Sequence, residues 1–112
     1  MAKKAASKTA RVVVLLGSES DLPVIEKMKP LLDRFGLSYR IEIASAHRQP
    51  AKLSRIVKQT EKSGTEVYVA VAGMAAHLPG VVASMTGKPV IGVPVASGPL
   101  AGVDALLSIV KM

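Results

Sequence analysis

Continuous apolar runs separated by helix-forming segments constrain the fold of this 112-residue chain more than any other feature. Arg11–Leu16 and Glu66–Ala72 are almost unbroken runs of aliphatic residues, and each is followed by a glycine. Such runs are typical of parallel strands, which are buried on both faces of their sheet. Pro89–Val95 repeats the pattern, and Ser38–Ala44 is an alternating version that we expect to be more exposed. The sequence therefore predicts four strands.

Helical patterns occupy the intervals between these strands. The first begins near Pro23 and ends near Gly36, and Pro30 inside it predicts a kink or break because proline removes a backbone hydrogen bond. We predict further helices at Pro50–Lys62, Leu78–Thr86 and Val103–Val110. Parallel strands joined by helices require right-handed crossovers, with helices on both faces of the sheet. The expected architecture is a doubly wound α/β domain.

The positive charge of the chain is concentrated at its amino terminus. The formal net charge is +7, and the first 11 residues carry four basic and no acidic side chains. We interpret residues 1–10 as a disordered basic tail and residues 11–112 as one domain. Nucleic-acid binding by the tail is a minor alternative, since the 3% aromatic content supplies no base-stacking platform.

Several classes of site and location are disfavoured by the composition. The chain has no cysteine, which excludes disulfides and thiolate ligands, and two histidines without a well-spaced carboxylate disfavour a metal site. No Gly-rich motif for nucleoside triphosphates or dinucleotides is present. No apolar run is long enough to span a bilayer, and the amino terminus lacks the apolar segment of a signal peptide. We therefore expect a cytoplasmic protein without a metal or other cofactor.

The loops after the first three expected strands hold the residues best suited to chemistry. In doubly wound sheets, ligands bind beyond the carboxyl ends of the strands. The three loops are Gly17-Ser18-Glu19-Ser20-Asp21, Ser45-Ala46-His47-Arg48-Gln49-Pro50 and Gly73-Met74-Ala75-Ala76-His77-Leu78-Pro79-Gly80. Both histidines of the chain lie in them. These loops predict one ligand site at that edge of the sheet.

The first loop and Arg48 favour a phosphorylated ligand. The hydroxyls of Ser18 and Ser20, with the free N–H groups that begin the next helix, can donate to phosphate oxygens. Asp21 would repel a phosphate, so we expect it to accept hydrogen bonds from ribose hydroxyls. Arg48 can hold a phosphate through two parallel hydrogen bonds. An ordinary helix-capping turn and a surface ion pair are the alternatives for the loop and for Arg48.

The two histidines point to proton transfer at the same edge. His47 can act as a general acid/base near neutral pH, although an isolated loop histidine is more often structural. His77 is bracketed by small residues that let a ligand approach the backbone. We expect His77 to pack against other groups or to position them.

Five segments together resemble one known family. They are Gly17–Asp21, Ser45–Arg48, Ala75–Gly80, Pro89–Val95 and Leu106–Val110. In order and spacing they resemble the N5-carboxyaminoimidazole ribonucleotide mutase family of purine synthesis, over about residues 11–112. The resemblance implies a flavodoxin-like three-layer αβα sandwich, a homo-octamer, and a reaction that needs neither metal nor ATP. That reaction moves a carboxylate from the exocyclic amine of an aminoimidazole ribonucleotide to ring carbon 4.

The resemblance also implies roles for the loop residues. His47 would be the catalytic acid/base: it would protonate the ring as carbon dioxide leaves and would later remove the proton from carbon 4. Arg48 would hold the ribonucleotide phosphate, and His77 would line the pocket. The other implied substrate contacts are Ser18, Ser20, Asp21, Ser45, Ala46, Gly73, Ala75, Ala76 and Leu78.

The chain departs from the family pattern at three places, one of which is the variant loop Ser97-Gly98-Pro99-Leu100 before the last expected helix. Met74 stands where many bacterial members have glycine. Family members usually continue past the equivalent of Met112 with a fifth strand and a carboxyl-terminal helix, so we expect an incomplete sheet edge. The alternative functions are direct carboxylation of aminoimidazole ribonucleotide by carbon dioxide and a non-catalytic ligand-binding or assembly module.

Overall fold

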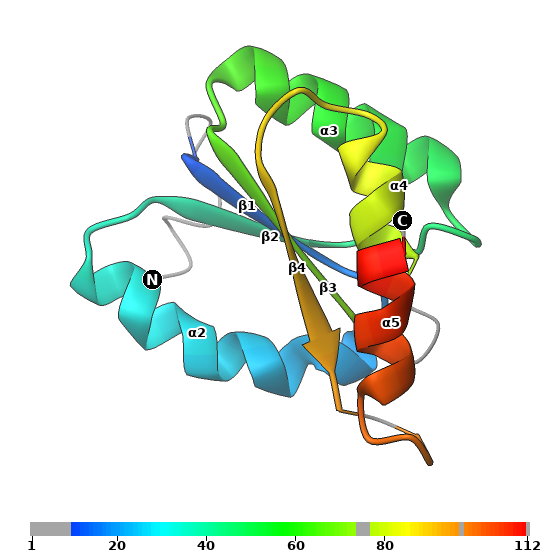
Figure 1. Ribbon diagram of the computed structural model, residues 1–112. Coiled ribbons are helices and arrows are strands. Elements are labelled where there is room, and N and C mark those ends of the chain that lie inside the picture. Colours follow the sequence, from blue (N-terminus) through cyan, green and yellow to red (C-terminus); the bar gives the residue numbers. More distant parts are fainter. Residues whose placement is uncertain (1–9, 74–76, 97, 112) are drawn as a thin grey trace.

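A parallel sheet of four strands forms the centre of the computed structural model, which describes residues 10–73, 77–96 and 98–111 (Figure 1). The strands are β1 (Val12–Leu16), β2 (Tyr39–Ile43), β3 (Val67–Gly73) and β4 (Val90–Val95). They are paired in the order β2-β1-β3-β4, and every pairing is parallel. This is the strand order of flavodoxin-like sheets, and it confirms the predicted α/β class.

The helices follow the predicted segments, and the largest difference at a boundary is the earlier end of the third predicted helix. They are the short 3-10 helix η1 (Glu19–Asp21) and the α-helices α2 (Leu22–Arg34), α3 (Pro50–Ser63), α4 (Leu78–Ala83) and α5 (Val103–Lys111). α4 ends before the predicted Thr86, because Ser84 donates both its N–H and its hydroxyl to the carbonyl of Val81.

The predicted break at Pro30 is absent: α2 continues through this residue without interruption. Proline leaves the carbonyl of the residue four positions earlier without its usual helical partner, and here that residue is Glu26. Pro30 and Glu26 are both exposed to solvent, so water can take the place of the lost hydrogen bond. The position of Pro30 on the outer side of α2 therefore lowers the cost of keeping the helix intact.

Helices cover both faces of the sheet, as predicted (Figure 1). Successive side chains of a strand point to opposite faces, so the fully buried strand β1 contributes to two cores. The core shared with α3 and α4 includes Val13, Leu15, Leu53 and Val82. The core shared with α2 includes Val14, Leu16 and Ile25. β2 lies at the sheet edge and is more exposed than β1, which confirms the prediction for the second strand.

The first described residues are bonded to the segment that directly precedes β3. Ala10 is buried, and its carbonyl accepts a hydrogen bond of 2.8 Å from the hydroxyl of Thr65. Arg11 forms an exposed ion pair with Glu66, with 2.7 Å between Nε and Oε2. Residues 1–9, most of the predicted tail, lie outside the described residues. In the described ranges, no helix has both the length and the apolar character needed to cross a membrane.

Backbone hydrogen bonds place the loops after β1 and β2 at the same edge of the sheet. The N–H of Gly17 donates to the carbonyl of Val71 at 3.1 Å, and the N–H of Ala44 donates to Leu16 at 2.9 Å. The ladder therefore continues one residue past β1 and β2. From β1, the chain first moves outward to β2 and then crosses back to β3, so the direction of winding changes between β1 and β3. This switch point is the expected place for a ligand.

Candidate functional site

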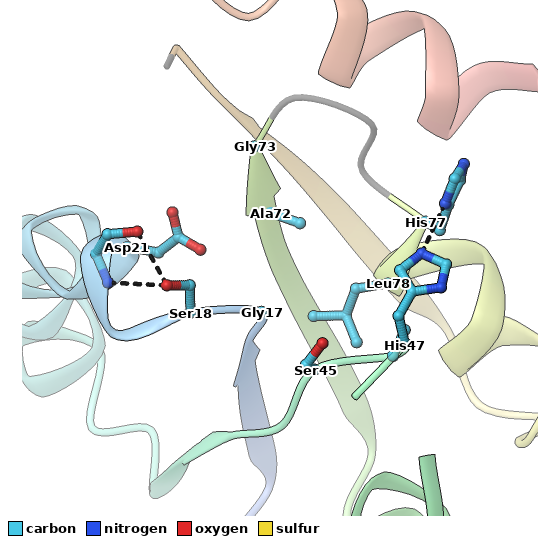
Figure 2. A pocket seen from close by; sticks show the side chains of 11 residues that line it. Gly17, Ser18, Asp21, Ser45, His47, Ala72, Gly73, His77 and Leu78 are labelled. Carbon is cyan, nitrogen blue, oxygen red and sulfur yellow. Dashed lines mark hydrogen bonds between the residues drawn. The ribbon is translucent and has the colours of Figure 1, made fainter. Parts of the chain in front are cut away.

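A cavity of about 320 Å³ opens at the carboxyl ends of β1 and β3 (Figure 2). The loop after β1, the loop after β2, the end of β3 and the start of α4 form its walls. The lining residues are Gly17, Ser18, Ser20, Asp21, Ser45, Ala46, His47, Ala72, Gly73, His77 and Leu78. Parallel strands place all three predicted loops around one cavity at the switch point.

Most of the predicted site residues line this cavity, and Arg48 is the exception among those the structure describes. Arg48 lines an adjoining cavity of about 510 Å³, which shares Gly17 and Ser18 with the first. Ala75 and Ala76 lie outside the described residues, as does Met74. The predicted set of contacts omitted Gly17 and Ala72. Both are small residues at the ends of buried strands, and that position is the signal that marks them.

The loop after β1 is organised around the hydroxyl of Ser18. Its oxygen accepts hydrogen bonds from the N–H of Ser20 at 3.3 Å and from the Ser20 hydroxyl at 3.0 Å. Ser18 thus caps η1, which leads directly into α2. Because the oxygen acts as an acceptor in both contacts, the hydroxyl proton of Ser18 can still be donated to a ligand.

Asp21 places a buried carboxyl group in the wall of the cavity. The residue is 6% exposed, and its side chain makes no capping hydrogen bond to α2. Burial raises the pKa of this carboxyl group above its ordinary value, while a hydrogen bond from the backbone of Ser18 partly opposes that effect. A ligand that donates hydrogen bonds to the carboxylate would stabilise its charged form. Asp21 therefore suits a ligand with hydroxyl groups.

The turn after β2 directs two neighbouring side chains to different cavities. The Ser45 hydroxyl accepts a hydrogen bond from the N–H of Arg48 at 3.2 Å, and the Ser45 carbonyl accepts one from Gln49 at 2.9 Å. His47 lines the first cavity and Arg48 lines the second. Within the described part of the chain, the Arg48 guanidinium makes no ion pair. Ser45 therefore holds the turn that separates the histidine from the arginine.

His47 and His77 contact each other across the cavity wall (Figure 2). Nε2 of His47 lies 2.9 Å from Nδ1 of His77, and the rings meet edge to face at an angle of 81°. The two residues are 30 positions apart in the sequence, and His77 directly precedes α4. A hydrogen bond at this distance requires a proton on one of these nitrogens and a lone pair on the other. The two imidazoles therefore share one proton.

Hydrogen bonding and proton exchange are the chemistry available in this cavity. Its titratable side chains are Asp21, His47 and His77, and three serine residues line the same space. Across the described ranges, no group of three or more His, Cys, Asp or Glu side chains is arranged to hold a metal ion. The arrangement is suited to a polar ligand that carries hydroxyl groups and exchanges protons.

Comparison with known proteins identifies a family over the same region. Residues 11–112 match the family model described as AIR carboxylase. The chain is 52% identical to the N5-carboxyaminoimidazole ribonucleotide mutase of Thermotoga maritima over 102 residues, which are 91% of this chain and 60% of the relative. It is 50% identical to the mutase of the same name from Pyrococcus horikoshii over 106 residues, which are 95% of this chain and 60% of the relative.

A solved structure agrees with the sequence comparison. Treponema denticola PurE is similar with a TM-score of 0.83 and 32% sequence identity, over 90% of this chain and 64% of that chain. The chain thus spans about 60% of the length of the curated relatives it matches. The family match begins at Arg11, immediately before β1, and includes all four strands and the three loops around the cavity. The chain therefore belongs to the AIR carboxylase family.

Proposed function

We propose that residues 11–112 supply the catalytic pocket of an N5-carboxyaminoimidazole ribonucleotide mutase in purine synthesis, with His47 as the acid/base. The observation that carries this proposal is the convergence of three loops on one cavity that holds His47, Asp21 and serine hydroxyls. The names of the relatives at about 50% identity support the same reaction. The proposal concerns the complete protein, since those relatives are longer than this chain.

The two adjoining cavities suit the two ends of a ribonucleotide. The phosphate binds Arg48 in the second cavity, where a guanidinium can form two parallel hydrogen bonds. The ribose hydroxyls donate to Asp21, and these hydrogen bonds stabilise a carboxylate whose charged form is disfavoured by burial. The aminoimidazole ring then lies in the first cavity beside His47. The shared wall of Gly17 and Ser18 connects the two halves of the ligand.

The proposed reaction moves one carboxylate within the substrate. A proton from His47 accompanies cleavage of the bond between the exocyclic nitrogen and the carboxyl carbon, which releases carbon dioxide and aminoimidazole ribonucleotide. Ring carbon 4 then forms a bond to carbon dioxide, and His47 removes the proton that this carbon carries. One proton is given and one is recovered, so the side chain returns to its starting state without a cofactor.

We further propose that the complete protein is a cytoplasmic homo-octamer, as the family resemblance implies. A stripe of exposed apolar residues on α5 supports self-association. Its members are between 49% and 66% exposed, and they are Val103, Leu106, Leu107 and Val110. Their spacing of three and four residues places them on one side of the helix, away from the buried Ala105. Apolar surface of this kind is typical of interaction sites.

The histidine-to-asparagine variant His47→Asn tests the assigned reaction. We expect the complete protein with this substitution to bind the ribonucleotide but to lose turnover of the carbamate by roughly 10²-fold to 10⁴-fold, the usual contribution of a general acid/base. Ligand binding by calorimetry and turnover by absorbance measure the two effects separately. Lys58→Asn, at an exposed position of α3, is the matched control. Unchanged turnover in the His47 variant would overturn its assignment.

The choice of substrate separates the mutase from a direct carboxylase, a distinction that matters because the matching family is described as AIR carboxylase. The wild-type protein is given the carbamate in one assay and aminoimidazole ribonucleotide with bicarbonate in another. We expect turnover of the carbamate at low concentration. Turnover of aminoimidazole ribonucleotide and bicarbonate, with none of the carbamate, would instead establish the carboxylase.

A further inference from the structure

The contact between His47 and His77 constrains the protonation of both rings. A neutral imidazole has one N–H donor and one nitrogen acceptor, so only two arrangements of the proton satisfy the distance of 2.9 Å between Nε2 of His47 and Nδ1 of His77. In one arrangement His47 donates to His77, and in the other the direction is reversed. If both facing nitrogens carried protons, the hydrogen bond would be lost. His77 must therefore be neutral when it accepts from His47.

The ordinary preference of imidazole selects between the two arrangements. Neutral histidine in peptides favours the form with the proton on Nε2. If His47 donates its Nε2–H to Nδ1 of His77, both rings adopt this favoured form. The reverse direction forces both rings into the less favoured form with the proton on Nδ1. The contact therefore favours donation from His47 to His77.

We propose that His77 is the positioning residue for His47: it accepts the Nε2–H of His47 and so holds that ring in one orientation, which leaves Nδ1 of His47 as the nitrogen that gives the substrate its proton and later recovers one. This inference rests on the proposed function, in which His47 exchanges protons with the substrate. His77 is well placed for the task because it is half-buried and directly precedes Leu78, which is 3% exposed and packs in the core. His47, by contrast, is exposed on the turn after β2. The better-anchored ring thus orients the less anchored one.

The remaining charged groups around the site leave this pairing intact. Asp21, the other titratable side chain of the cavity, comes from the loop after β1, whereas the histidines come from the turn after β2 and the residue before α4. Arg48 and Glu19 line the adjoining cavity. Within the described part of the chain, neither histidine ring forms an ion pair with a carboxylate. His77 is therefore the side chain that controls the tautomer of His47.

Nitrogen NMR tests the contact without reference to activity. In the complete protein labelled with ¹⁵N-histidine, the imidazole signals of His47 and His77 are identified by their loss in His47→Asn and His77→Leu. At about pH 8, we expect His47 to carry a proton on Nε2, with a scalar coupling across the hydrogen bond to Nδ1 of His77. In His77→Leu, we expect His47 to become a mixture of tautomers. An unchanged His47 spectrum in that variant would overturn the proposal.

Kinetics of two variants test the positioning role in the complete protein. His77→Leu removes the acceptor, and we expect kcat to fall by about 10²-fold with little change in KM, the effect of misplacing a reacting group. In His77→Asn, an amide oxygen near the position of Nδ1 can accept the same bond, so we expect most of the loss in kcat to be restored. Equal losses in both variants, or a change confined to KM, would contradict a positioning role. Absence of carbamate turnover in the wild type would refute the proposed function, while the spectra would still decide the histidine contact.

Discussion

The Asp21 carboxyl group links ligand binding to the stability of the fold. Burial raises its pKa in the folded chain above the value of about 3.9 expected in the unfolded chain. Folding therefore favours the protonated form. The contribution of this carboxyl group to the free energy of unfolding is fully present below the unfolded pKa, and it is lost as the pH rises through the folded pKa. Above the unfolded pKa, the buried carboxyl group therefore lowers the stability of the fold that holds it.

Asp21→Asn should therefore raise the melting temperature at pH 7, because an amide of similar shape carries no charge to bury. Below the unfolded pKa of about 3.9 the carboxyl group of the wild type is neutral as well, so the gain should disappear. Thermal unfolding followed by circular dichroism at both pH values measures the difference. The same variant should bind the ribonucleotide more weakly. A lower melting temperature at pH 7 would show instead that the hydrogen bond to the carboxylate outweighs the cost of burial.

Individual site residues differ in how far the sequence predicts them. Loop position after a strand predicts the common location of His47, Asp21 and the serines, because parallel strands end at one edge of the sheet. It does not predict the contact between His47 and His77, which depends on how α4 packs against the sheet. It also does not predict that Arg48 lines a separate cavity, because the Ser45 turn sets that direction. The spacing of the motifs predicts which residues lie at the same edge of the sheet. The cavity that each side chain lines depends on local hydrogen bonds.

At the scale of elements, Gly92 sets the distance of α4 and α5 from β4. A Cβ added at this glycine would lie 2.9 Å from Cγ2 of Ile109 and 3.2 Å from Cβ of Pro79. Ile109 belongs to α5 and Pro79 to α4, so one missing side chain lets two helices approach the same strand. This close packing explains why the strand tolerates a residue that contributes no side chain of its own.

Gly92→Ala should destabilise the fold by about 1–3 kcal/mol, the usual cost of overpacking a core. Urea unfolding measures the change as a lower midpoint. Gly87→Ala is the matched control, since nothing lies within 4 Å of its added Cβ. In the background of Ile109→Ala, which removes the nearest contact, the cost of Gly92→Ala should shrink. Equal effects of the two glycine substitutions would contradict this account of the packing.

The types of the elements are more predictable than their boundaries and their neighbours. Apolar runs and helical spacing predict each strand and each α-helix, because burial of one side leaves a period in the sequence. The end of α4 depends on the local bonds of Ser84, and the continuity of α2 depends on the exposure of Pro30. The order β2-β1-β3-β4 depends on which face each crossover helix covers, and no single segment carries that information.

At the scale of the whole molecule, α5 is the element whose environment is least complete. Ala105 is buried in the core shared with α3 and α4, and Ile109 packs against that core. The opposite stripe of α5 consists of large apolar side chains that face solvent. A helix that is apolar on both sides is typical of a position between two packed layers. In the described part of one chain, the sheet and its core form one of these layers, and the exposed side of α5 has no second layer against it.

Leu106→Lys combined with Val110→Lys should therefore reduce the assembly of the complete protein. Each lysine would have to bury a charge in the interface, which is costly without a partner. Sedimentation velocity should show a large particle for the wild type and smaller species for the variant. Gln59→Lys, which adds positive charge at an exposed position of α3, should leave the assembly unchanged. An unaltered sedimentation coefficient for the α5 variant would place the subunit interface elsewhere.

The wall of Gly17 and Ser18 that separates the two cavities has a consequence for inhibitor design. A fragment with an anionic group can engage Arg48, and a flat polar ring can occupy the space beside the two histidines. Neither fragment alone fills both spaces. A short linker across the wall would make the second contact intramolecular, which raises affinity without any new contact to the protein. The backbone of two small residues thus determines the length that such a linker must have.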